Sequence, residues 1–213
     1  MIGSEFQNYL VSALLGYLVG SFPTAYIFVK LNSQIDIRQA GSGNVGARNA
    51  FDVSGSKIVG LVVLLIDVLK GTGAVLLSLL FFGNEFWIIA SGGIGAIMGH
   101  NFSLWMKFKG GKGLATTSGV MLLLGWMYIV IWLVLYFIMQ QFIKHVHLSS
   151  VIASVLSPIF LIIIPERWMT AVLFFPHRFS DVFWMCVISS FIIIIRHIEP
   201  IKEFIHLNNK ISE

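Results

Sequence analysis

Long apolar runs separated by short polar segments make up most of this chain. A run of about 20 apolar residues is long enough to cross the hydrocarbon core of a bilayer as an α-helix. We therefore predict an all-α fold, a polytopic membrane helical bundle. The clear apolar runs cover residues 9–31, 58–82, 86–98, 114–139, 148–164 and 182–195.

A further apolar stretch, residues 168–176, is too short to cross a membrane unaided. It either completes a span with the residues before it or lies partly in the interface. We expect five to seven spans, with about seven favoured. Pro23 is expected to kink or interrupt the first span. Small residues spaced four apart predict close helix contacts, and these are Gly16 with Gly20, and Ser91 with Gly95 and Gly99.

Composition supports the membrane assignment. Hydrophobic residues make up 57% of the chain, charged residues 11%, and the mean hydropathy is +0.87. An ordinary soluble domain is excluded, because lipid must solvate part of so much apolar surface. The lone cysteine, Cys186, lies in an apolar run, so we expect neither an internal disulfide nor a cysteine metal pair.

Basic residues predict the orientation. Segments 30–57 and 99–113 and the tail after residue 195 hold ten of the 14 Lys and Arg residues. Positively charged loops lie on the cytoplasmic side, so the N-terminus is expected outside and the number of spans odd. Lys107 and Lys109 are interpreted as interfacial anchors. This topology places three histidines on the opposite face: His145, His147 and His177.

The segment "GSGNVGARNAFD", residues 41–52, is unusually rich in polar and small residues for a membrane edge. Its glycines permit positive φ and close backbone approach, so successive N–H groups could face one concavity. Ser42 and Asn44 add hydrogen-bonding groups, and Arg48 adds a rigid cation. Together they suit a phosphate-bearing ligand. The alternative is a connector that hydrogen-bonds its own backbone.

A second segment, "KGGKG" at 109–113, is not a Walker A loop, because glycine follows Lys112. It still suits a phosphate, since Lys112 supplies charge and the start of the following helix favours anions. We interpret Lys112 as a ligand-binding residue rather than an orienting charge. The glycines expected to form the phosphate-binding turn with it are Gly110, Gly111 and Gly113.

Three further polar residues fall in or beside apolar runs. His197 follows the last run and could orient a hydroxyl or transfer a proton; alternatively, it is an interfacial histidine with no role. Asp67 and Lys70 lie mid-span at i and i+3, on one helical face. Charges at that depth are costly unless they are paired, so we predict a structural ion pair that also faces the site.

Taken together, these segments resemble the PlsY family of bacterial acyl-phosphate:glycerol-3-phosphate acyltransferases. The resemblance covers nearly the whole chain and implies one domain, residues 1–213, with seven spans. It rests on "GSFP" (20–23), "DIRQAGSGNVGARN" (36–49), "DVLKG" (67–71), "GHNF" (99–102), "FKGGKGLATTSG" (108–119) and "RHIEPIK" (196–202).

The resemblance implies transfer of an acyl group from acyl phosphate to the 1-hydroxyl of glycerol 3-phosphate at the cell membrane. The products are lysophosphatidic acid and phosphate, and neither metal nor another cofactor is required. It implies a lipid environment and no nucleic-acid partner. Ser42 and His197 become candidate catalytic residues, and Asn44, Lys112 and its neighbouring glycines substrate-binding ones. Without a Ser-His-Asp arrangement, direct attack by the substrate hydroxyl is expected.

Two residues depart from the family pattern. Asp52 stands where the first motif ends in arginine, and Pro200 where the third motif has asparagine. Either Arg48, four residues earlier, replaces the missing charge, or binding is lost. The alternatives are therefore a non-catalytic relative that binds lipid phosphates or a partner, and an enzyme for another polyol phosphate. A phosphometabolite transporter is disfavoured, because the polar groups crowd one membrane face.

Overall fold

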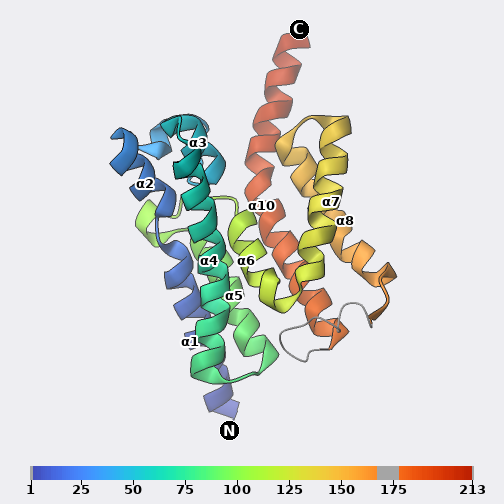
Figure 1. Cartoon of the computed structure of the whole chain (residues 1–213). Coiled ribbons are helices and arrows are strands. Elements are labelled where there is room, and N and C mark those ends of the chain that lie inside the picture. Colours follow the sequence, from blue (N-terminus) through green and yellow to red (C-terminus); the bar gives the residue numbers. More distant parts are fainter. Residues whose placement is uncertain (1, 167–177, 213) are drawn as a thin grey trace. The chain divides into compact units, whose positions relative to one another are not determined.

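The computed structural model of the protein describes residues 2–166 and 178–212, and every regular element within them is a helix (Figure 1). The all-α prediction is confirmed. The chain forms two compact units, residues 1–124 and 125–213. The first holds α1 Ile2–Ser21, α2 Thr24–Ser33, η1 Ile37–Gln39, α3 Ala47–Ser54, α4 Lys57–Phe82, α5 Phe86–Asn101, η2 Leu104–Met106 and α6 Leu114–Leu124. The second holds α7 Trp126–Ile143, α8 Val146–Ile163 and α10 Phe179–Ser212.

Five helical segments of the described residues are long and apolar enough to cross a membrane. The multi-span prediction is therefore confirmed, while a total of seven spans stays a prediction. The runs predicted at 58–82 and 148–164 correspond to α4 and α8, and the run at 182–195 is part of the longer α10. Residues 168–176 lie outside the described residues. The five segments are Glu5–Ser33, Lys57–Phe82, Trp126–Ile143, Val146–Ile163 and Phe179–His206.

The single span predicted at 114–139 is wrong. The helix is interrupted at Gly125, whose φ of −179° and ψ of 64° are not helical, so two helices form, α6 and α7. Apolarity continues across the break, so hydropathy gives no sign of it. At about 1.5 Å per residue, the 11 residues of α6 are too short to cross a membrane alone.

The small residues predicted to mediate helix contacts join α1 to α5. A Cβ atom at Gly16 would lie 1.9 Å from the carbonyl oxygen of Gly92, and one at Gly20 would lie 2.0 Å from that of Ala96. Gly95 and Gly99 approach α1 carbonyls equally closely. The prediction is confirmed, and it explains why side chains are absent here: the two backbones touch.

Pro23 interrupts the first span as predicted, because α1 ends at Ser21 and α2 begins at Thr24. Beyond this break, a buried apolar cluster fastens the following loop to α2, α3 and α4. Ile37 and Val45 come from the loop, and both are buried in the cluster. The remaining members are Ala25, Val29, Ala50, Val59 and Val63.

In the second unit, α8 packs against both α7 and α10. Hydrogen bonds between polar side chains supplement the apolar contacts. The Tyr128 hydroxyl lies 2.8 Å from Ser190 Oγ, and Trp132 Nε1 donates to Ser154 Oγ at 2.9 Å. In Figure 1, α8 and α10 run antiparallel, so the start of α8 lies beside the C-terminal part of α10.

Candidate functional site: two polar loops and a buried charge cluster

Asn49 holds the first polar loop, residues 40–46 between η1 and α3, in place. Its Oδ1 accepts a hydrogen bond from the backbone N–H of Ser42 at 2.9 Å, and its Nδ2 donates to the carbonyls of Ala40 at 3.1 Å and Asn44 at 3.0 Å. The side chain is buried, at 2% exposure. Sequence reasoning missed this residue. The available signal was an asparagine beside apolar Ala50 on a helix that directly follows the loop.

Ser42 and Asn44 lie on this loop, which passes through left-handed backbone at Gly41 (φ +59°) and Gly43 (φ +68°). Ser42 is exposed and Asn44 half-buried. The expected positive φ is therefore present at two of the glycines. Because Asn49 satisfies the backbone groups of the loop, the Ser42 and Asn44 side chains are displayed on a fixed frame.

Arg48 and Asp52 lie one turn apart on α3, as their spacing predicted. Arg48 Nε is 3.3 Å from Asp52 Oδ2, and the two side chains are 80% and 47% exposed. Such exposed pairs contribute little to stability. The pair nevertheless places an anion beside the cation that we expected to bind phosphate.

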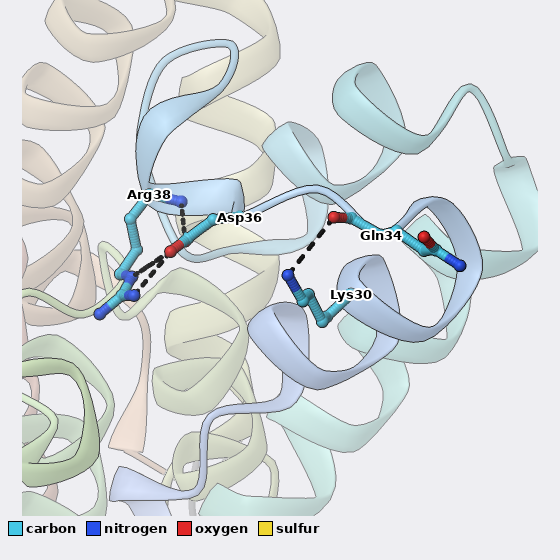
Figure 2. A network of polar contacts seen from close by, with 4 residues as sticks. All are labelled: Lys30, Gln34, Asp36 and Arg38. Carbon is cyan, nitrogen blue, oxygen red and sulfur yellow. Dashed lines mark hydrogen bonds and ion pairs between the residues drawn. The ribbon is translucent and has the colours of Figure 1, made fainter.

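A second ion pair fixes the start of the loop (Figure 2). The Arg38 guanidinium donates to both carboxylate oxygens of Asp36, at 2.9 Å through Nε and 2.6 Å through Nη2. It also lies over the Tyr26 ring, 5.1 Å from the centroid. The hydrogen bonds from Arg38 lower the pKa of Asp36 to about 2. At neutral pH, Asp36 is therefore ionised and forms an ion pair with Arg38.

The glycine turn, residues 109–113, packs against the C-terminal end of α5. The N–H of Gly110 donates to the Asn101 carbonyl at 3.1 Å, and the N–H of Gly111 donates to the His100 carbonyl at 3.0 Å. A Cβ at Gly110 would lie 2.0 Å from the His100 carbonyl oxygen. Gly113 has a positive φ of +82°. The glycines are therefore required by close packing more than by backbone freedom.

Asp67 and Lys70 form the predicted ion pair on α4. Lys70 Nζ lies 2.7 Å from Asp67 Oδ1, and both residues are buried. Lys70 also donates to the Phe22 carbonyl at 2.5 Å, at the break between α1 and α2. A third member was missed: His100 Nδ1 is 3.6 Å from Asp67 Oδ1. The "GHNF" segment contained the signal, a histidine at the end of an otherwise apolar helix.

A polar pocket joins this charge cluster to the glycine turn. The cavity itself is only about 10 Å³, roughly the space of one water molecule, and Val45 of the first loop also lines it. The sequence-predicted residues that it brings together are Asp67, Lys70, Gly110 and Gly111. The predicted residues Ser42, Asn44, Arg48, Lys112 and Gly113 belong to the same unit but are not part of the lining of this pocket.

His197 belongs to the second unit and is fully buried. Its Nδ1 lies 2.8 Å from the Ile193 carbonyl oxygen, and its ring centroid is 5.3 Å from that of His147. His145 likewise lies beside Phe204 of α10, with 3.9 Å between ring centroids, so the prediction that His145 and His147 fall on the opposite face from His197 is wrong. The physical reason is the antiparallel packing of α8 on α10, which hydropathy did not reveal. His177 lies outside the described residues.

Comparison with known proteins identifies the family. The family model described as glycerol-3-phosphate acyltransferase matches residues 10–207. The chain belongs to the glycerol-3-phosphate acyltransferase family. A relative of this name from Rhodopseudomonas palustris (strain BisB5) is 40% identical over 72% of this chain and 76% of its own. Glycerol-3-phosphate acyltransferase 2 of Lactobacillus johnsonii is 37% identical over 93% of this chain and 85% of its own.

Solved structures extend the similarity to the fold. Crystal structures of PlsY, an integral membrane glycerol 3-phosphate acyltransferase, match in two forms. The glycerol 3-phosphate form has a TM-score of 0.74 and 29% identity, covering 93% of this chain and 92% of the other. The lysophosphatidic acid form has a TM-score of 0.73 and 28% identity over the same shares. The membrane helical bundle predicted from sequence is therefore that of the acyltransferase family.

The two departures from the family pattern occupy different settings in this acyltransferase. Asp52 is half-exposed and paired with Arg48. Pro200 lies inside α10, which continues to Ser212. Proline has no backbone N–H to donate within a helix, so α10 lacks one backbone hydrogen bond three residues beyond His197.

Proposed function

We propose that the protein transfers an acyl group from acyl phosphate to the 1-hydroxyl of glycerol 3-phosphate in phospholipid biosynthesis, releasing lysophosphatidic acid and phosphate. The observation that carries this proposal is the family match over residues 10–207. The similarity to PlsY in forms with glycerol 3-phosphate and with lysophosphatidic acid supports the acceptor and the product. The acyl phosphate donor follows from the resemblance of the motifs to the PlsY family.

Phosphate recognition falls to the two polar loops. Lys112 and the turn formed by Gly110, Gly111 and Gly113 would bind the phosphate of glycerol 3-phosphate, with Arg48 adding charge. Asn44 would contribute from the first loop. The fixed seat of the turn on α5 supports this role, because a preorganised anion site does not lose conformational freedom when the ligand binds.

Ser42 and His197 would be the catalytic residues of the chemical step. The 1-hydroxyl oxygen attacks the acyl carbonyl carbon, the bond from that carbon to the phosphate oxygen breaks, and phosphate leaves with the bonding electrons. The hydroxyl proton passes either to His197 or to a phosphate oxygen of a substrate. Catalysis would rest on positioning and on neutralising the leaving phosphate.

The proposed setting is the cell membrane, with the N-terminus outside and both loops and the C-terminus in the cytoplasm. The charge distribution of the loops supports this orientation. The acyl chain would lie among the helices, open to lipid, while glycerol 3-phosphate enters from the cytoplasm. Residues 1–213 would act as one domain, with no metal or other cofactor.

The direct test measures phosphate release from palmitoyl phosphate by the purified protein, with and without glycerol 3-phosphate. We expect release that depends on glycerol 3-phosphate, with stoichiometric lysophosphatidic acid, and at least a ~100-fold loss in Lys112→Ala. A wild-type rate no higher than that of Lys112→Ala would contradict the proposal.

The Arg48–Asp52 ion pair favours a second candidate, a relative that binds lipid phosphates or a partner without catalysis. In that case glycerol 3-phosphate or lysophosphatidic acid would raise the melting temperature while palmitoyl phosphate stays intact. Gain of turnover in the double variant Asp52→Arg, Pro200→Asn would support this second function for the natural chain. Turnover with another polyol phosphate alone would instead indicate a different acceptor.

A further inference from the structure

His100 occupies the junction between the buried ion pair and the glycine turn. Its backbone carbonyl accepts the N–H of Gly111 at 3.0 Å, so the residue already holds the turn through its main chain. Its ring also lies against the turn, since a Cβ at Gly111 would be 2.1 Å from His100 Nε2. The imidazole is therefore in direct contact with the α carbon of Gly111.

The opposite edge of the ring faces the charge cluster. Nδ1 lies 3.6 Å from Asp67 Oδ1, and that carboxylate is bound by Lys70, whose Nζ also donates to the Phe22 carbonyl. A chain of contacts thus runs from the break between α1 and α2, through α4, to the glycine turn. All its members are buried or line one pocket.

We propose that His100 is a positioning residue for the phosphate-binding turn, holding Gly110 and Gly111 in place because its ring is braced by Asp67 and Lys70. Its kinetic consequence rests on the proposed function, whereas its effect on the turn does not. In this proposal His100 acts on the substrate through Gly110 and Gly111, so it is a positioning residue and not a catalytic one.

The braced ring explains why a charged cluster is retained at this depth. A buried ion pair contributes little net stability, since desolvation offsets the attraction between the charges. The pair therefore serves to orient groups, and the groups it orients are the Phe22 carbonyl and the His100 ring. Without Asp67, the imidazole would be free to rotate away from Gly111.

Two isosteric replacements separate the edges of the ring. Asn places an amide nitrogen near the position of Nδ1, facing Asp67, whereas Gln places one near Nε2. His100→Asn keeps the side that faces Asp67 but no longer reaches Gly111, so we expect it to raise the KM for glycerol 3-phosphate about threefold. His100→Ala and His100→Gln should raise it about 10-fold, equivalent to about 1.4 kcal/mol, with the KM for palmitoyl phosphate changed less than about twofold.

Ser78→Ala is the matched control. Ser78 is a buried polar residue of α4, the helix that carries Asp67 and Lys70; its Oγ accepts from Ser12 Oγ at 2.8 Å and donates to the Ala74 carbonyl. The change removes buried hydrogen bonds remote from the turn, so it lowers the melting temperature without altering either KM. An equal rise in the glycerol 3-phosphate KM in Ser78→Ala would overturn the proposal, because a general loss of stability would then suffice.

Hydrogen exchange tests the positioning without turnover. In detergent micelles, the amides of Gly110 and Gly111 should exchange about 10-fold faster in His100→Ala and Asp67→Asn than in wild type, and at the wild-type rate in Ser78→Ala. Unchanged exchange in both variants would overturn the proposal. An inactive wild-type protein with this exchange pattern would sink the proposed function alone, while an active one with unchanged KM in His100→Ala would sink this inference alone.

Discussion

The two polar loops of the first unit are held in place by opposite means. The loop before α3 depends on one side chain, since Asn49 bonds the backbone at Ser42, Ala40 and Asn44. The glycine turn depends on missing side chains, because Gly110 and Gly111 press against His100. The two segments look alike in sequence because both are rich in glycine, but they are held rigid in different ways. They should therefore respond to different mutations.

Gly110→Ala is expected to produce the largest effect. The new Cβ would lie 2.0 Å from the His100 carbonyl oxygen, a backbone atom that cannot rotate away, so the turn must leave its seat. We expect kcat/KM for glycerol 3-phosphate to fall at least ~100-fold, or about 2.7 kcal/mol. Steady-state kinetics of the purified protein measure this loss.

The control for this change is Gly73→Ala on α4, where a Cβ would meet nothing within 4 Å. Alanine is favoured over glycine inside a helix by about 0.5–1 kcal/mol, so this variant should melt at the same or a higher temperature and keep its activity. Wild-type kinetics in Gly110→Ala would mean that the turn is not closely seated.

Asn49→Ala should have the next largest effect. It removes the partner of the Ser42 N–H and of three carbonyls at once, and each buried polar group left without a partner costs about 1–3 kcal/mol. We expect a ~10- to 30-fold fall in kcat/KM together with faster amide exchange at Ser42. Ser54→Ala removes only hydrogen bonds at the far end of α3, to the Ala50 carbonyl and from the Ser56 N–H, and should leave both quantities unchanged.

Asn49 also marks the limit of what the sequence could predict. Contacts set by helical spacing were predictable, namely Asp67 with Lys70, Arg48 with Asp52, and the small-residue faces of α1 and α5. Asn49 and His100 were missed as parts of the site because their contacts depend on how a loop folds back or how two distant helices pack. The break at Gly125 was missed for a related reason: apolar residues continue across it.

Asp52→Asn tests whether the exposed Arg48, which follows the first loop, contacts the substrate phosphate. Removing the carboxylate 3.3 Å from Arg48 Nε frees the guanidinium for an anionic ligand. We expect the KM for glycerol 3-phosphate to fall about three- to fivefold, since exposed pairs contribute below about 1 kcal/mol. The gain should shrink as ionic strength rises. An unchanged KM at low salt would indicate that Arg48 does not contact the substrate phosphate.

The smallest expected effect comes from Asp36, whose partner Arg38 fixes the start of the same loop. Because the folded-state pKa of Asp36, about 2, lies below its ordinary 3.8, the pair stabilises the protein fully above the ordinary value and loses its effect as the pH falls toward 2. Asp36→Asn should therefore lower the melting temperature by a small amount, below about 2 °C, that is constant from about pH 5 to 8. The difference should shrink below about pH 4. Melting curves of both proteins in detergent measure it, and a difference that changed between pH 5 and 8 would assign the pH dependence to another group.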